Sequence, residues 1–253
     1  MAIALSVLMI TKNSDELLDT SLSSIANLAD EIVIVDDFSK DKTISIAKKY
    51  KSVTYSRHED DLGSQRAFGL SKCRGEWILM LDADEVISQQ LKGEIRSIVD
   101  SRLSNVSGYK IQYQNHLFGK PIYFGGENYR ILRLFKRKKA RINSNLVHEH
   151  VKINGLTDLL QNKILHYSYR RPCQIIQKFT DYAHREARKK AQQNEKLSLQ
   201  KLILYPCHMV WARYIKDKGY KDGLIRLFLD LAFGYMEFCT YFFLIFERNR
   251  NKK

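Results

Sequence analysis

The first 100 residues alternate continuous apolar runs with helical patterns, and this alternation restricts the fold more than any other feature. Runs such as EIVIV at 31–35 and EWILML at 76–81 are typical of strands covered on both faces. Strands that alternate with helices at this spacing predict a doubly wound, mostly parallel α/β sheet. In chain order, we expect a strand at 3–10, a helix at 15–28, a strand at 31–35, a helix at 41–50, a strand at 52–55, a helix at 64–72, a strand at 76–81 and a helix at 88–101.

Acidic residues follow two of these strands directly. Asp36 and Asp37 end the second strand, and Asp82-Ala83-Asp84-Glu85 ends the fourth. Ligands of doubly wound sheets bind beyond the carboxyl ends of the strands, so both acidic pairs belong to the expected crevice. Two carboxylates as close as Asp82 and Asp84 repel each other unless a cation lies between them, and a hard divalent ion that also holds a diphosphate fits. The alternative is that one of them caps the next helix.

Several common sites are not supported by the sequence. Neither Gly-x-Gly-x-x-Gly nor the P-loop pattern occurs after the first strand. The four cysteines form no Cys-x-x-Cys pair, which argues against a zinc cluster and favours reduced thiols in a cytosol. The apolar run that opens the sequence is interpreted as a buried strand rather than a signal peptide, because no basic leader precedes it.

From about residue 105 the pattern changes. Alternating residues at 109–113 predict a strand with one wet face, and glycines between 119 and 126 predict a loop. Further strands are expected at 131–136 and 146–153, and helices at 173–195, 199–215 and 222–247. We therefore expect a catalytic domain over 1–170 and a helical region over 171–253.

Charge is distributed unevenly along the chain. Residues 1–100 hold 12 Lys and Arg against 17 Asp and Glu, whereas residues 101–253 hold 30 against 11. A basic half favours an anionic partner, although a solvated basic surface is the simpler alternative. Nucleic acid is a poor candidate for that partner, because no recognised motif is present and the acidic crevice would repel phosphate.

Four short motifs occur in a fixed order at the strand ends. They are Thr11-Lys12-Asn13, the run from Asp36 to Thr43, Gly63-Ser64-Gln65-Arg66 and Asp82-Ala83-Asp84-Glu85. This set resembles the inverting family 2 glycosyltransferases of the GT-A fold, over about residues 3–170. The resemblance implies that Thr11 and either Asp36 or Asp37 contact a pyrimidine base and its ribose. An aspartate that accepts the ring N–H suits uracil.

The same resemblance implies roles for the second group of residues. Arg66 lies near the nucleotide, unless it is simply a solvated helix charge. Asp82 faces the ribose or a metal ion, and Asp84 binds the metal. His166 is a candidate third ligand or a diphosphate contact, with a structural histidine as the alternative. Mg²⁺ or Mn²⁺ would neutralise charge on the departing diphosphate.

Inversion at a sugar carbon requires a general base for the acceptor hydroxyl. Here the chain has His148 and Glu149, within Val147-His148-Glu149-His150. With Asp-Ala-Asp-Glu, Arg133-Leu134-Phe135 and the stretch from His166 to Tyr169, this resembles a subset of lipopolysaccharide-core glucosyltransferases that act on heptose. The match implies Glu149 as base, His148 beside the nucleotide sugar, UDP-glucose as donor and a lipid-anchored saccharide as acceptor. The alternative for residues 147–150 is a strand whose polar residues face solvent. Glu127 is the other acidic residue between 101 and 157, and hence the other candidate base.

A second enzyme class shares this fold. A polyprenyl-phosphate glycosyltransferase would keep the metal site and need no protein base, because a phosphate acceptor is already ionised. The two classes therefore differ in whether Glu149 matters.

The last helical pattern is long and apolar but carries regularly spaced charges. Asp222, Arg226, Asp230 and Glu237 fall on one face of a helix, which predicts an amphipathic helix rather than a lipid-spanning one. Docking on the catalytic domain, lying in a membrane interface and self-association all remain open. The preceding basic helix favours an anionic membrane. We expect a cytoplasmic protein, peripheral on the inner membrane, with homo-oligomerisation as a further possibility.

Overall fold

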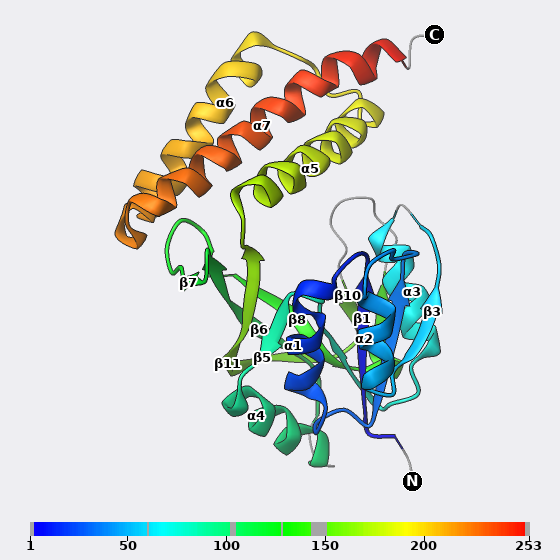
Figure 1. Cartoon of the computed structure of the whole chain (residues 1–253). Coiled ribbons are helices and arrows are strands. Elements are labelled where there is room, and N and C mark those ends of the chain that lie inside the picture. Colours follow the sequence, from blue (N-terminus) through cyan, green and yellow to red (C-terminus); the bar gives the residue numbers. More distant parts are fainter. Residues whose placement is uncertain (1–2, 60, 102–104, 128, 143–150, 251–253) are drawn as a thin grey trace. The chain divides into compact units, whose positions relative to one another are not determined.

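A computed structural model describes residues 3–59, 61–101, 105–127, 129–142 and 151–250 of the chain (Figure 1). The chain divides into two compact units. Unit 1 contains Met1–Tyr113 and Tyr129–His166, and unit 2 contains Gln114–Asn128 and Tyr167–Lys253. The loop before residue 128 therefore belongs with the C-terminal helices.

The alternation expected for the first 100 residues is confirmed (Figure 1). In order, the elements are β1 (Leu5–Thr11), α1 (Asp15–Ile25), β2 (Glu31–Asp36), α2 (Thr43–Lys49), β3 (Val53–Ser56), α3 (Leu62–Lys72), β4 (Trp77–Met80), β5 (Glu85–Ile87) and α4 (Gln89–Asp100). They are followed by β6 (Val106–Leu117), β7 (Lys120–Pro121), β8 (Arg130–Lys136), β9 (Ala140–Ile142), β10 (Val151–Ile153) and β11 (Leu156–Tyr169).

The main sheet combines a parallel and an antiparallel half. Among the described residues its strand order is β3-β2-β1-β4-β8-β6-β11-β5, with β7 paired to β6. The first four strands are parallel, and β8 then joins β4 in the antiparallel direction. β1 therefore lies between β2 and β4, and the carboxyl ends of all three strands meet at one edge.

Two apolar clusters explain why β1 is a continuous apolar run. Val7 and Met9 point to one side, where they join Leu18 and Leu22 of α1 in a buried cluster. Leu8 points to the other side, into a second cluster with partly buried side chains of α3, β9 and β10. Both faces of β1 are covered, so its sequence shows no alternation of apolar and polar residues.

The structure departs from the expected elements at several places. The helix expected at 15–28 ends at Ile25, and the helix expected at 199–215 is α-helical to Trp211 and continues as a π-helical segment over Ala212–Lys216. The strand expected at 146–153 is described from Val151, as β10. β11 was not expected at all. Most of its first half is exposed and shows no regular alternation of buried and exposed positions, which is the signal that sequence reasoning uses.

Unit 2 is built on three helices, α5 (Pro172–Gln192), α6 (Leu199–Trp211) and α7 (Leu224–Arg250). Its core joins Leu117 and Ile122 to Phe179 of α5 and Leu229 of α7. The loop that follows β7 is thus part of the helical core.

By length and composition alone, Leu224–Arg248 is apolar enough to cross a membrane, a property shared by core helices of other proteins. The charges at the start of α7 face inward: Arg226 and Asp230 are fully buried. The spacing of these charges therefore identifies a packed face, against the loop of residues 122–127, rather than a wet one.

Candidate active site

The ends of β1 and β2 lie side by side, with Thr11 opposite Asp36. The Thr11 hydroxyl donates to one oxygen of Asp36 at 2.7 Å, and the backbone N–H and hydroxyl of Ser39 also donate to this carboxylate. Asp36 is 1% exposed. Its carboxylate therefore fixes the turn that follows β2.

Asp37 is placed differently. Its carboxylate accepts from Lys12 Nζ and lies against His58 Nδ1, both at 2.7 Å, and its side chain is 16% exposed. Burial opposes ionisation, but Lys12 and His58 outweigh it and hold the pKa of Asp37 below its usual value. Asp37 is thus an ionised acceptor that reaches the surface at this edge.

A cluster of charged and hydroxyl groups lies beyond β4. We call it the strand-end cluster, and it consists of Arg66, Asp82, Glu85, Tyr113 and Arg133. Asp82 accepts from Arg66 Nη2 and from Arg133 Nη2, each at 2.8 Å, one on each carboxylate oxygen. Burial opposes ionisation of Asp82, but the two guanidinium groups hold its pKa well below the usual range. Asp82 is therefore anionic, and in this state it faces arginines.

Glu85 forms the buried side of the strand-end cluster. One of its oxygens accepts from Arg133 at 2.8 Å and from the Tyr113 hydroxyl at 2.6 Å. The other oxygen accepts the backbone N–H of Asp82. Burial raises the pKa of Glu85 above its usual value, against the opposing effect of Arg133. Glu85 thus positions Arg133 and the backbone of Asp82.

Asp84 lies beside His166, as the sequence resemblance implied. Their Oδ2 and Nε2 atoms are 3.5 Å apart, and both side chains are partly exposed. β11 brings His166 here, because His166 pairs with Glu85 in the register of β11 and β5. Mg²⁺ and Mn²⁺ complete their coordination with water and phosphate oxygens, so a carboxylate with an adjacent imidazole fits such an ion in part.

Asp82 was expected to complete the metal-binding set, and its ion pairs with Arg66 and Arg133 point it elsewhere in this state. Among the residues that the structure describes, no group of three or more His, Cys, Asp or Glu side chains is assembled for a metal ion.

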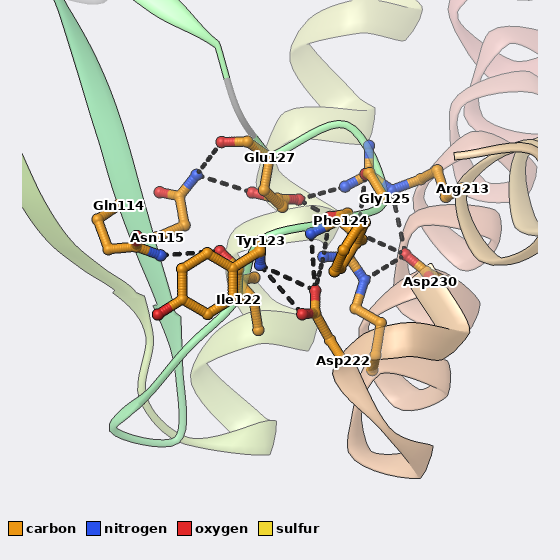
Figure 2. Close-up of polar contacts among 11 residues, drawn as sticks. Gln114, Asn115, Ile122, Tyr123, Phe124, Gly125, Glu127, Arg213, Asp222 and Asp230 are labelled. Carbon is orange, nitrogen blue, oxygen red and sulfur yellow. Dashed lines mark hydrogen bonds and ion pairs between the residues drawn. The ribbon is translucent and has the colours of Figure 1, made fainter. Parts of the chain in front are cut away.

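The two residues expected to carry the base chemistry, His148 and Glu149, lie outside the described residues. Glu127, the other acid of that segment, is buried in unit 2. It accepts from Asn115 Nδ2 at 2.8 Å and is ion-paired with Arg213 and Arg226 (Figure 2). Glu127 is therefore part of a scaffold within unit 2.

Sequence reasoning gave no role to Glu85, Tyr113 or Arg133, although their contacts order the strand-end cluster. Glu85 and Arg133 stood within motifs that were noticed, next to residues with an implied role. Tyr113 had only its place on an alternating strand. Tyr113 and Arg133 are brought together by the pairing of β6 with β8, and Glu85 lies on β5, which pairs with β11; the sequence displays neither pairing.

Comparison with known proteins agrees with this geometry. The profile of the family described as Glycosyl transferase family 2 matches residues 6–155. An uncharacterised glycosyltransferase of Rickettsia prowazekii is 31% identical over 223 residues, which cover 82% of this chain and 74% of the relative. The poly(ribitol-phosphate) β-N-acetylglucosaminyltransferase TarS of Staphylococcus aureus is 29% identical over 121 residues, 44% of this chain and 21% of that protein.

A solved structure shares the fold. The crystal structure of S. aureus TarS 1-349 in complex with UDP-GlcNAc superposes with a TM-score of 0.50 and 15% identity, over 94% of this chain and 91% of that one. This likeness confirms the GT-A type of α/β fold that the sequence motifs implied.

Proposed function

Because the chain belongs to glycosyl transferase family 2, we propose that this glycosyltransferase moves glucose from UDP-glucose to a lipid-anchored saccharide, such as the inner core of lipopolysaccharide. The observation that carries the proposal is the meeting of two acidic sites at one sheet edge. Asp37 follows β2, Asp84 follows β4, and both strands flank β1 in parallel. A nucleoside at the first site and its diphosphate at the second would span this edge.

The donor base is assigned to the first site. Asp37 is an ionised acceptor at the surface, which suits the N–H of uracil, whereas Asp36 is buried and accepts from Thr11 and Ser39. Thr11 then acts through Asp36, and Asp37 contacts the base. Arg66 is only partly buried beside Asp82, so we assign its guanidinium to the diphosphate.

A divalent ion, Mg²⁺ or Mn²⁺, is assigned to the second site. Asp84 and His166 would hold it, and its charge would stabilise the departing diphosphate. Asp82 remains a candidate ligand once a diphosphate draws Arg66 away. Arg133, held by Glu85 and Tyr113, keeps the Asp82 carboxylate oriented in either case.

The acceptor hydroxyl needs a base on the opposite side of the sugar from the leaving group. We assign this role to Glu149, with His148 beside the nucleotide sugar. Glu127 is a weaker candidate, because two arginines already neutralise it in the interior of unit 2.

The acceptor is proposed to carry phosphate. Lys138, Lys139, Arg141 and Lys152 line a cavity of about 600 Å³ next to the β9–β10 pair. Four cations around one cavity favour an anionic group. TarS, by its name, acts on poly(ribitol-phosphate), which is also rich in phosphate. The same cavity favours a second candidate function, transfer to a polyprenyl phosphate.

A lipid-anchored acceptor also places the reaction at a membrane. We propose that residues 1–170 carry out the transfer and that residues 171–253 hold the protein on the cytoplasmic face of the inner membrane. Residues 171–253 hold 17 Lys and Arg against 8 Asp and Glu, and this positive balance supports their contact with an anionic membrane.

The proposal is tested by a donor screen. Purified protein is incubated with Mn²⁺ or Mg²⁺ and with UDP-, GDP-, CDP- and ADP-sugars, and the released nucleoside diphosphate is measured. We expect release from UDP-glucose above the other donors, and stabilisation by UDP above the other diphosphates in thermal-shift titrations. Preference for GDP would overturn the assignment of the base to Asp37.

A further inference from the structure

From the geometry of unit 2 we infer a membrane-docking tip, formed by the segment from the end of α6 to the start of α7 (residues 211–225) and by the neighbouring loop 122–126, which binds anionic lipid. This inference rests on the proposed function, because it supposes an acceptor held in a membrane. The inference goes further by assigning the membrane contact to this tip. The proposed donor site does not depend on that assignment.

The tip exposes large apolar side chains at high density. Trp211, Ile215, Tyr220 and Leu224 are all exposed, Leu224 to 83%. α6, which is described over its full length, has no fully buried side chain. Soluble surfaces rarely gather such groups without a partner, and Trp and Tyr are enriched where protein meets the lipid headgroups.

Basic residues are interleaved with these apolar ones. Lys216, Lys218 and Lys221 are exposed in the same turn. Of the acids in this turn, all of which is described, Asp217 is exposed and Asp222 is turned inward to the loop. An anionic lipid surface complements this charge. A second copy of the chain meeting the tip face to face would bring like charges together, so lipid fits better than self-association.

The tip also contains a cavity. Its volume is about 380 Å³, and it is lined by Tyr123, Phe124, Lys216, Asp217 and Lys218, together with two glycines. This size lies within the range of small-molecule sites. The two lysines outnumber the one aspartate of this lining, so the cavity suits a phosphate-bearing headgroup, with the apolar side chains of the tip reaching toward the acyl chains.

Buried charges hold the two halves of the tip together. The Asp222 carboxylate accepts the backbone N–H groups of Tyr123 and Phe124 at 3.0 and 2.9 Å (Figure 2). Arg226 donates to the carbonyl oxygens of Phe124 and Gly125, each at 2.9 Å. Gly125 has a φ of +68°, and a Cβ there would overlap the Arg226 guanidinium. The loop is therefore fixed before any ligand arrives, which lowers the entropy lost on binding.

The two tryptophans provide a direct readout. Trp211 is 52% exposed in the tip, whereas Trp77 is 2% exposed in unit 1. The full chain is titrated with vesicles of phosphatidylglycerol and phosphatidylcholine, and separately with phosphatidylcholine alone. We expect binding to the anionic vesicles that weakens as salt rises, with a blue shift of the tryptophan emission that disappears in Trp211→Tyr.

Matched charge reversals locate the contact. The triple variant Lys216→Glu, Lys218→Glu, Lys221→Glu is expected to weaken vesicle binding at least about 100-fold, since each lysine near an anionic surface is worth about fivefold. The control carries the same three reversals at Lys48, Lys49 and Lys51, which are exposed in unit 1. Thermal unfolding of both triple variants shows that each is folded.

The inference would be overturned by no binding to anionic vesicles, by equal loss in both triple variants, or by vesicle binding without a change in Trp211 emission. A Trp211 shift that follows protein concentration without vesicles would instead identify an interface between copies of the chain, and would also overturn it. UDP binding without vesicles tests the donor site separately, so failure of the tip and failure of the proposed function give different patterns.

Discussion

Two clusters of ion pairs, one in each unit, use similar groups under different conditions. In unit 1 the strand-end cluster sets Asp82 and Glu85 against Arg66 and Arg133. In unit 2 a second set, which we call the loop–helix network, consists of Glu127, Arg213, Asp222, Arg226 and Asp230 (Figure 2). Both cross-link segments that are far apart in the chain.

The clusters differ in access. Asp82 and Arg66 are partly exposed at the carboxyl end of a parallel strand, where a ligand can replace one partner with another. In the loop–helix network the carboxylates of Glu127, Asp222 and Asp230 are at most 4% exposed, against 28% for Asp82, so no ligand can reach them. The comparison indicates that exposure, rather than the presence of paired charges, separates a candidate site from a scaffold.

The largest effect is expected from Glu149→Gln, which tests whether catalysis lies outside the loop–helix network. The amide keeps the shape of the side chain and removes its basicity. Transfer to a hydroxyl acceptor should fall by about 100-fold to 10,000-fold, the usual contribution of a general base. Initial rates of glucose transfer measure this, and UDP binding should persist.

Glu127→Gln is the matched control for that variant. It leaves Arg213 and Arg226 with less negative charge, so the change should appear mainly in stability. If Glu127→Gln abolishes transfer in folded protein and Glu149→Gln does not, the comparison between the clusters fails. If neither variant matters, a phosphate acceptor and the polyprenyl-phosphate function are favoured.

The next largest effect is expected from Arg226→Met, which breaks the loop–helix network. The variant leaves the buried Asp230 with less compensation and two backbone carbonyl groups without their donor. Breaking a buried ion pair costs about 3–5 kcal/mol. Urea unfolding measures the loss. A change within about 0.5 kcal/mol would show that this network is not structural.

Asp84→Ala tests the proposed metal site beyond the carboxyl end of β4. It removes one proposed metal contact beside His166, so turnover should fall at least about 100-fold, from lost stabilisation of the leaving group. Asp158→Ala, at an exposed position of β11, is the control. Full activity of Asp84→Ala, or of the unmodified protein in EDTA, would contradict the metal assignment.

The smallest effect concerns the pH dependence of stability that comes from Glu31, a carboxylate outside both clusters. Burial raises its pKa, but bonds from Ser6 and Arg74 outweigh this and lower the pKa below its usual value. A lowered folded pKa gives stability that is present above the unfolded value of about 4.3 and is lost as pH falls below it. Glu31→Gln should remove about 1 kcal/mol at pH 7 and less at pH 3. An equal loss at both pH values would contradict this sign.

How much the sequence revealed depended on the range of the contacts involved. Apolar runs and the acids that end them identified β1, β2 and β4 and the edge where they meet, because each signal lies within ten residues. β11, the strand that brings His166 to Asp84, was missed because only Leu160 and Ile164 are buried in it and no regular alternation surrounds them. The burial of Arg226 was equally hidden, since the carbonyl groups of Phe124 and Gly125 that it binds are about 100 residues away in the chain.

The most direct test of the central claim, that the partly exposed groups beyond the carboxyl end of β4 bind the donor and the buried loop–helix network supports the fold, is a calorimetric titration of UDP with Mn²⁺. The unmodified protein, Asp84→Asn and Glu127→Gln are compared below their unfolding temperatures. We predict that Asp84→Asn weakens UDP binding at least about tenfold, in line with the loss of one charge-assisted contact, and that Glu127→Gln leaves it unchanged. Equal affinities for Asp84→Asn and the unmodified protein would contradict the account.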